Sequence, residues 1–105
     1  KAVDLRFDET LLINAKLPGF SFRKQVLQRI DFSAADLRQC DFRDARFEDC
    51  SLREAHLVDA RFDGADLRGA DLGGLRLGDA SRFRGATISR AQASQLLGEL
   101  GLKVL

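Results

Sequence analysis

Large apolar residues recur in this chain at every fifth position, and this spacing constrains the fold more than any other feature. In the segment ADLRQCDFRDARFEDC, residues 35–50, Leu37, Phe42 and Phe47 lie five apart, each two residues after an Ala or a Cys. A helix keeps apolar residues on one face only when they recur about every 3.6 positions, and a strand only when they recur about every two. A short extended stretch followed by a corner accommodates a period of five. The pattern therefore predicts a solenoid.

The five-residue period extends over most of the chain. The large residues that follow it are Phe7, Leu12, Leu17, Phe22, Leu27, Phe32, Leu37, Phe42, Phe47, Leu52, Leu57, Phe62, Leu67, Leu72 and Leu77. The residue two places before each of them is usually small, and we expect both positions to face the core. After Leu77 the register slips by one residue and resumes with Phe83 and Ile88, as a small bulge at a corner would produce.

The segments AADLRQCDF, GADLRGADL and ARFDG resemble the repeats of the pentapeptide-repeat family. The resemblance covers about residues 3–88 and extends to the C-terminal helix of the quinolone-resistance, gyrase-binding members. It implies an all-β solenoid, a right-handed quadrilateral β-helix of about four coils with four repeats to a coil. Four sides would stack Phe22, Phe42, Phe62 and Phe83. Three sides would stack Phe32, Phe47 and Phe62 instead. The resemblance to the family favours four sides.

Gln25 is a polar exception among the inward positions, in the least regular stretch of the repeats. A buried Gln without hydrogen-bond partners costs about 1–3 kcal/mol. We expect Gln25 to cap the opening near the first coil. The alternative is that residues 23–29 loop out and rejoin the repeats in frame, which would make the charged segment FRK a recognition loop.

The chain divides into repeats at residues 1–88 and a C-terminal segment at residues 89–105. Ser89 followed by Gln92 is a capping box, which is typical of the start of a helix. One apolar helical face follows, and Gly101 is placed to end the helix. That face consists of Ala93, Leu96, Leu97 and Leu100. The tail LKVL, residues 102–105, predicts a short strand.

The C-terminal segment has two interpretations, a cap on its own solenoid or a seam between two copies. A β-helix exposes the edges of its last coil, and such edges associate unless they are covered. In the gyrase-binding members that this chain resembles, C-terminal helices join two β-helices end to end, so the resemblance implies a homodimer. The candidate residues for either role are Leu96, Leu97, Leu100 and Val104.

Length and composition agree with one small domain that does not enter a membrane. A chain of 105 residues lies within the ordinary range for one core, and no apolar run could span a bilayer or act as a signal peptide. The chain lacks Met and begins at Lys1, which indicates a part of a longer protein. Cys40 and Cys50 occupy inward positions on different sides, so we expect buried free thiols in a cytoplasmic protein rather than a disulfide.

No residue pattern indicates catalysis, a cofactor or a metal site. His56 is the only histidine and lies between Ala55 and Leu57, so we expect its ring to point outward. A general base or a metal ligand needs partner groups, and a convex solenoid wall offers no obvious cleft for them. The sequence therefore predicts a protein without enzymatic activity.

Charge differs between the sides of the expected coil, although 17 basic and 16 acidic residues give a formal net charge of only +1. The side built around Phe32 and Leu52 carries Asp31, Glu54 and Asp71 against Arg53 only. We take these three acidic residues as the candidate interaction face. The opposite side, built around the Phe series, carries Arg23, Lys24, Arg43, Arg61, Arg82 and Arg84 against Asp41, Asp44 and Asp63.

Two functions follow from these observations. The first is a protein-interaction or scaffold module whose flat faces present charges at fixed spacing to a protein partner. The second, which the resemblance implies, is a DNA mimic that binds a type II topoisomerase such as DNA gyrase and protects it from fluoroquinolones. The nearly balanced charge imitates a polyphosphate poorly and so favours the first. Direct binding of nucleic acid ranks third, because the basic side has no exposed aromatic residues for stacking.

Overall fold

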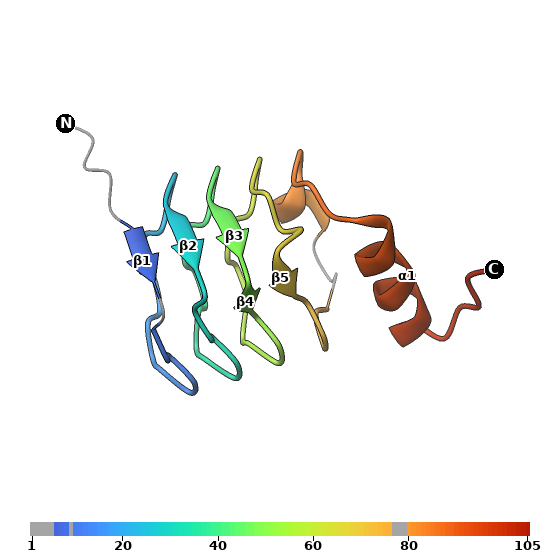
Figure 1. Cartoon of the computed structure of the whole chain (residues 1–105), viewed down its shortest axis with the longest axis horizontal. Helices are drawn as coiled ribbons and strands as arrows, with labels where there is room; N and C mark the ends of the chain where they lie inside the picture. The colour runs from blue at the N-terminus through green and yellow to red at the C-terminus, as the bar shows by residue number, and fades with distance from the viewer. Residues whose placement is uncertain (1–5, 9, 77–79) are drawn as a thin grey trace.

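The structure is a parallel β-solenoid in which the chain returns to the same position every twenty residues. The computed structural model describes residues 6–8, 10–76 and 80–105. Three strands form one sheet, β1 (Arg6–Asp8), β2 (Val26–Gln28) and β3 (Arg46–Glu48), and lie one after another along the rod in Figure 1. A second sheet pairs β4 (Cys50–Ser51) with β5 (Ala70–Asp71). All these pairs are parallel and join residues twenty apart, which is four repeats of five.

The other pairs between coils are single bridges, because the chain turns a corner after each short extended stretch. Most of them also join residues twenty apart, as Lys16 with Asp36 and Ser21 with Asp41 do. We name the four sides by their inward residues. The first side contains Leu27, Phe47 and Leu67, the second Leu12, Phe32, Leu52 and Leu72, the third Leu17, Leu37 and Leu57, and the fourth Phe22, Phe42, Phe62 and Phe83.

Corners are formed by residues with a left-handed backbone, two places after the inward large residue. At Ala34 φ is 57°, and the amide of Ala35 donates to the carbonyl of Phe32 at 2.9 Å, which closes the turn. Residues with a Cβ adopt this region at a cost, because the Cβ crowds the following carbonyl. The described non-glycine residues that do so are Asn14, Lys24, Arg29, Ala34, Gln39, Asp44, Asp49, Glu54 and Asp59.

The core is a column of aromatic rings on the fourth side, packed against Phe32 from the second side. The rings of Phe22, Phe42, Phe62 and Phe83 stack with centroids 5.0, 4.9 and 5.0 Å apart and planes within 5° of parallel. Phe32 meets the edges of Phe22 and Phe42, with centroids 5.6 and 6.2 Å away. The second and fourth sides therefore meet in the core, and the predicted stack of Phe22, Phe42, Phe62 and Phe83 is confirmed.

The one-residue slip expected after Leu77 is present, although Leu77 itself lies outside the described residues. The 3₁₀-helix η1 (Ala80–Phe83) precedes the resumed repeat. Asp66 then pairs with Thr87, twenty-one residues on, and the amide of Phe62 donates to the carbonyl of Arg82 at 2.8 Å. The added residue therefore falls between Asp71 and Arg82, and Phe83 still stacks on Phe62.

Gln25 stays in the coil, so the alternative in which residues 23–29 loop out is wrong. Strand β2 pairs in register with β3, which holds this segment against the next coil, and Leu27 is fully buried. The side-chain oxygen Oε1 of Gln25 is buried and has no hydrogen-bond partner among the described residues. The inward assignment is thus correct, and it leaves one polar atom unsatisfied.

The C-terminal helix α1 (Arg90–Glu99) begins at the predicted capping box. Ser89 Oγ accepts from the Gln92 amide at 3.1 Å, and Gln92 Oε1 accepts from the Ser89 amide at 2.8 Å. Figure 1 shows α1 at the end of the rod, beyond the last coil. The part of the chain that the structure describes contains no helix with the length and apolar character needed to cross a membrane.

The tail at residues 102–105 does not form the predicted strand. These residues have no regular secondary structure, and the Leu102 amide donates to the carbonyl of Leu97 at 3.1 Å, closing the end of the helix instead. A strand needs an edge to pair with. Local apolar content alone is therefore insufficient to make a strand of this tail.

Candidate interaction surface

The second side brings the three predicted acidic residues onto one face, but in two columns. Asp31 and Asp71 occupy the same position in coils two apart, with Ser51 between them in register. Neighbouring strands are about 4.8 Å apart, so the two aspartates lie about 10 Å from each other along the rod. Glu54 lies at the corner, in the left-handed conformation with φ 57°.

Local hydrogen bonds hold the carboxylates of Asp31 and Asp71 in place. Asp31 accepts from the amide of Ser33 at 2.9 Å and from its hydroxyl, and Ser33 Oγ lies 3.0 Å from Ser51 Oγ. Asp71 accepts from the amide of Gly73 at 2.9 Å. A short polar side chain that binds the backbone two residues on makes a turn of fixed geometry. Both carboxylates are therefore ordered before any partner arrives.

Charge on this face is only lightly neutralised. Arg53 reaches Asp71 with Nη1 3.5 Å from Oδ1, and both side chains remain about half exposed. Among the described residues, neither Asp31 nor Glu54 forms an ion pair. The Glu54 carboxylate lies over Gly74, whose open backbone leaves room for it. The second side thus presents three carboxylates against one cation.

Elsewhere the same aspartate position is paired with arginine. Asp36 binds the guanidinium of Arg38 through two hydrogen bonds, at 2.8 and 2.7 Å, and Asp41 with Arg43 and Asp66 with Arg68 repeat the arrangement. The hydrogen bond from Arg38 lowers the pKa of Asp36 from 3.8 to about 2. The corresponding bonds from arginine lower the pKa of Asp41 and Asp66.

The residue two places after the aspartate decides whether its carboxylate is paired within its own repeat. Where that residue is arginine, it neutralises its own repeat. Where it is serine or glycine, as after Asp31 and Asp71, only a neutral hydrogen bond forms within the repeat, and the cation that reaches Asp71 is Arg53 of the neighbouring coil. Ser33 and Gly73 position the two carboxylates and were missed by the sequence reasoning, and the signal for them was the contrast between D-x-R and D-x-S or D-x-G.

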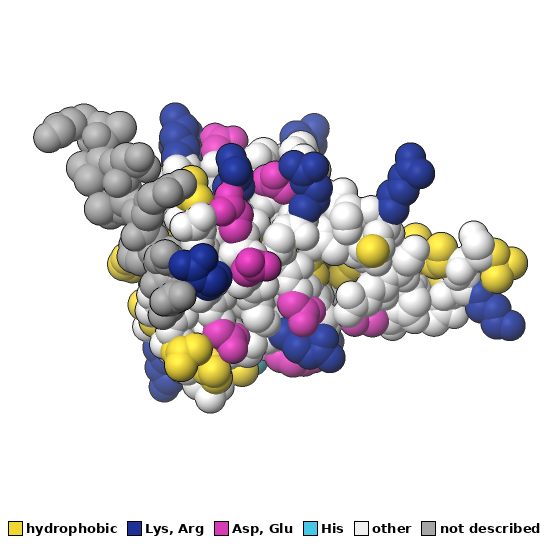
Figure 2. Space-filling model, in the orientation of Figure 1, with side chains coloured by type: hydrophobic (Ala, Val, Ile, Leu, Met, Phe, Trp, Pro, Cys, Tyr) yellow, Lys and Arg dark blue, Asp and Glu magenta, His cyan; other side chains and the backbone are white. Residues whose placement is uncertain are grey.

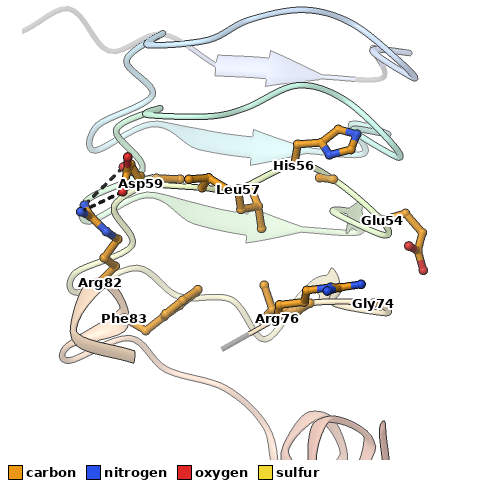
Figure 3. Close-up of a pocket in the computed structure, with 12 residues that line it drawn as sticks. Glu54, His56, Leu57, Asp59, Gly74, Arg76, Arg82 and Phe83 are labelled. Carbon is orange, nitrogen blue, oxygen red and sulfur yellow. Dashed lines mark hydrogen bonds and ion pairs between the residues drawn. The ribbon is translucent and has the colours of Figure 1, made fainter. Parts of the chain in front are cut away.

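A hollow of about 490 Å³ lies on the third side, lined by apolar residues of two coils and by a charged rim. Leu57, Leu75 and Phe83 contribute apolar surface, and Arg82 pairs with Asp59 at 3.2 Å. Figure 3 shows this pair at one end of the hollow and Glu54 with the ring of His56 at the other. His56 is exposed, as predicted, and within the described ranges no three His, Cys, Asp or Glu side chains are grouped to bind a metal.

The two cysteines are free and buried, as predicted. Cys40 Sγ donates to the carbonyl of Leu17 at 3.0 Å, and Cys50 Sγ donates to that of Leu27 at 3.1 Å. Burial raises the pKa of both thiols, which disfavours the reactive thiolate. They act as small core residues.

Helix α1 divides the predicted apolar face between the core and the surface. Leu96 is buried and belongs to the core, whereas Leu97, Leu100 and Val104 are 39, 68 and 48 % exposed. Gln92 Nε2 donates to the carbonyls of Leu67 and Ala70 at 2.7 and 2.8 Å, which fixes the helix on its own last coil. The predicted apolar face is thus covered by the coil at Leu96 and open to solvent at Leu97 and Leu100.

Comparisons with known proteins bear on the repeats. The family model for pentapeptide repeats matches residues 6–44 and 45–81, with eight copies. Full-length QnrB1, a plasmid-mediated fluoroquinolone resistance protein, is 20 % identical, with 91 % of this chain and 68 % of that chain covered and a TM-score of 0.37. A trypsin-treated QnrB1 variant is 17 % identical, with 96 % and 92 % covered and a TM-score of 0.32. No curated protein matches. Because the family model covers most of the chain, this protein belongs to the pentapeptide-repeat family.

Proposed function

We propose that this chain is a non-enzymatic protein-interaction module that binds its partner through the carboxylates of the second side. The observation that carries the proposal is the pair Asp31 and Asp71, held by backbone hydrogen bonds two coils apart. Their spacing is set by the ladder between coils rather than by flexible side chains. A face ordered in advance loses little side-chain entropy on binding, which favours recognition of a partner with cations at the same spacing.

The test compares two variants that lose the same charge. Asp31→Asn with Asp71→Asn removes the proposed contacts and keeps the hydrogen bond to the following turn. Asp44→Asn with Asp49→Asn is the control, because both residues are exposed corners in the left-handed region, where Asn is tolerated. The proposal is supported if the immobilised wild type and the control variant retain a protein that the Asp31→Asn, Asp71→Asn variant does not retain. Identical sets of retained proteins for all three would contradict it.

Binding to a type II topoisomerase is the narrower form of this proposal. The acidic second side would then occupy part of the DNA-binding site. A supercoiling assay of purified DNA gyrase, with and without a fluoroquinolone, tests it with the same two variants. Loss of protection in the Asp31→Asn, Asp71→Asn variant, with protection kept in the control variant, supports this form. If the wild-type chain changes neither the supercoiling activity of gyrase nor its inhibition by the fluoroquinolone, the topoisomerase form is rejected. The general proposal is then decided by the retention experiment alone.

We further propose that two copies associate through the apolar surface at the C-terminal end. Leu97, Leu100 and Val104 are exposed there, and Figure 2 shows hydrophobic side chains gathered at that end of the rod. From membership of the family we also propose that the coil winds in the right-handed sense through about four turns, and that the protein is cytoplasmic. Two rods joined end to end would double the length of the acidic face offered to a two-fold symmetric partner.

A further inference from the structure

The fourth side has a distinct charge pattern on its outer surface. It consists of four stretches, residues 21–24, 41–44, 61–64 and 82–85, and the bridges of Ser21 with Asp41 and of Asp41 with Arg61 stack the first three in that order. The amide of Phe62 bonds to the carbonyl of Arg82 and continues the stack. Side chains on this surface therefore repeat with the spacing of the coils.

The middle of the fourth side carries no excess of positive charge, because Arg43 and Arg61 lie there with Asp41, Asp44 and Asp63. Arg43 binds both carboxylate oxygens of Asp41, at 2.9 and 2.8 Å, in one coil. Arg61 binds Asp63 at 2.9 Å in the next coil. Because Asp41 is in register with Arg61, the four residues form a checkerboard of alternating charge. These four groups neutralise one another, and exposed Asp44 leaves the centre of the face slightly negative.

The two ends of the fourth side are positive. Arg23 and Lys24 lie in the first of its four stretches, and Arg84 lies in the last. All three are exposed, and none forms an ion pair with another described residue. Three steps of about 4.8 Å separate the two ends, a distance of about 14 Å, which an extended peptide spans with about four residues.

We propose that the fourth side binds an acidic segment of a partner protein, with carboxylates at both ends of the segment and neutral residues between them. The positive ends match the acidic groups, and the middle of the face, with Asp44 beside the checkerboard, matches a spacer without carboxylates. A nucleic acid fits less well, because its evenly spaced phosphates would lie over Asp41, Asp44 and Asp63. A second copy of this chain fits less well too, since a strip of this length buries far less than the about 800 Å² per partner of a stable interface.

The contact surface is small and charged, so binding is expected to be weak, fast and sensitive to salt. This inference does not depend on the acidic second side, which lies across the core. The two faces can be tested separately, because no residue belongs to both.

The experiment uses a fluorescent peptide, EEGSGEE, and measures its anisotropy on titration with the whole chain. We expect binding at 20 mM salt that weakens at least tenfold at 200 mM. The charge reversals Arg23→Glu with Lys24→Glu, and Arg84→Glu alone, should each weaken binding at least fivefold. Lys16→Glu is the matched control, because Lys16 is exposed in the same coil as Arg23 but lies on the third side. It should leave binding unchanged.

Two further probes separate the proposal from its competitors. The peptide EEEEGSG carries the same charge without the spacing, and it should bind at least threefold more weakly. A single-stranded oligonucleotide of equal charge should bind no better than EEGSGEE. The proposal is overturned by absence of peptide binding at low salt, by equal weakening in Lys16→Glu, by equal affinity for EEEEGSG, or by tighter binding of the oligonucleotide.

Discussion

Phe42 and Phe62 stack with their ring centroids 4.9 Å apart and their planes 5° from parallel, in coils that follow one another. The separation is close to the spacing between parallel strands, so the ladder and the aromatic column share one repeat. Backbone pairing and ring stacking therefore reinforce each other. Sliding one coil relative to the next would therefore disturb the backbone pairing and the ring stacking together.

Replacing Phe42 by Ala should lower the free energy of unfolding by about 3–5 kcal/mol, because it removes a fully buried ring with stacked neighbours on both sides. Arg43→Ala is the control in the adjacent position and should cost under about 1 kcal/mol, since its ion pair is at the surface. Urea unfolding followed by circular dichroism measures both. Equal midpoints for the two variants would mean that the inward assignment is wrong.

Replacing Gln25 by Met should raise the free energy of unfolding by about 1 kcal/mol. The two side chains are similar in size, and the substitution removes a buried oxygen that has no hydrogen-bond partner among the described residues. Gln25→Glu should destabilise the protein, because a carboxylate at this position would be partly buried without a counter-ion. Thermal unfolding of the two variants against wild type tests the pair, and a stabilised Glu variant would contradict the burial of this side chain.

Replacing Ala34 by Gly should raise the free energy of unfolding by about 0.5–1 kcal/mol. The left-handed backbone at φ 57° costs a residue with a Cβ about 1–2 kcal/mol, and the greater flexibility of glycine in the unfolded chain offsets part of the gain. Ala45→Gly is the matched control, because Ala45 is buried and has a negative φ. It should be destabilising. If both substitutions destabilise the protein equally, the corner geometry is not the cause.

Stability should fall in acid as the paired aspartates titrate. The folded pKa of Asp36 is about 2, below its usual value of 3.8, so the contribution of its pair with Arg38 is complete above about pH 4 and is lost as the pH falls toward 2. Arg38→Gln removes the main cause of the lowered pKa. Titration of the Asp36 carboxyl by nuclear magnetic resonance should then give a pKa nearer 3.8 in the variant, and an unchanged value would exclude the guanidinium as the cause.

Changing Leu97 and Leu100 together to Glu should convert a dimer into a folded monomer, because carboxylates would then lie in an apolar seam. The repeats should remain intact, since each coil is stabilised mainly by its neighbours. Light scattering and circular dichroism measure the two properties. Leu96→Glu differs, because Leu96 is buried against the last coil and its change should release the helix. A wild type that is monomeric at high micromolar concentration would reject the seam.

Much of the fold follows from local regularity in the sequence. The five-residue period predicted which positions face the core, and the resemblance to the pentapeptide-repeat family put Phe22, Phe42 and Phe62 in one stack, which the contacts between these rings confirm. The capping box of Ser89 and Gln92 could also be predicted from the sequence, since both of its hydrogen bonds lie within four consecutive residues.

Other features depend on contacts between residues distant in the chain. Whether a helical leucine is buried is set by how the helix docks, and Gln92 docks it through the carbonyls of Leu67 and Ala70, so that Leu96 is covered and Leu100 is not. The tail at residues 102–105 is apolar enough for a strand but lies against no partner edge. Pairing of charges likewise requires a register: Asp59 meets Arg82 only because the coils bring residues twenty-three apart together, a separation that no local pattern encodes.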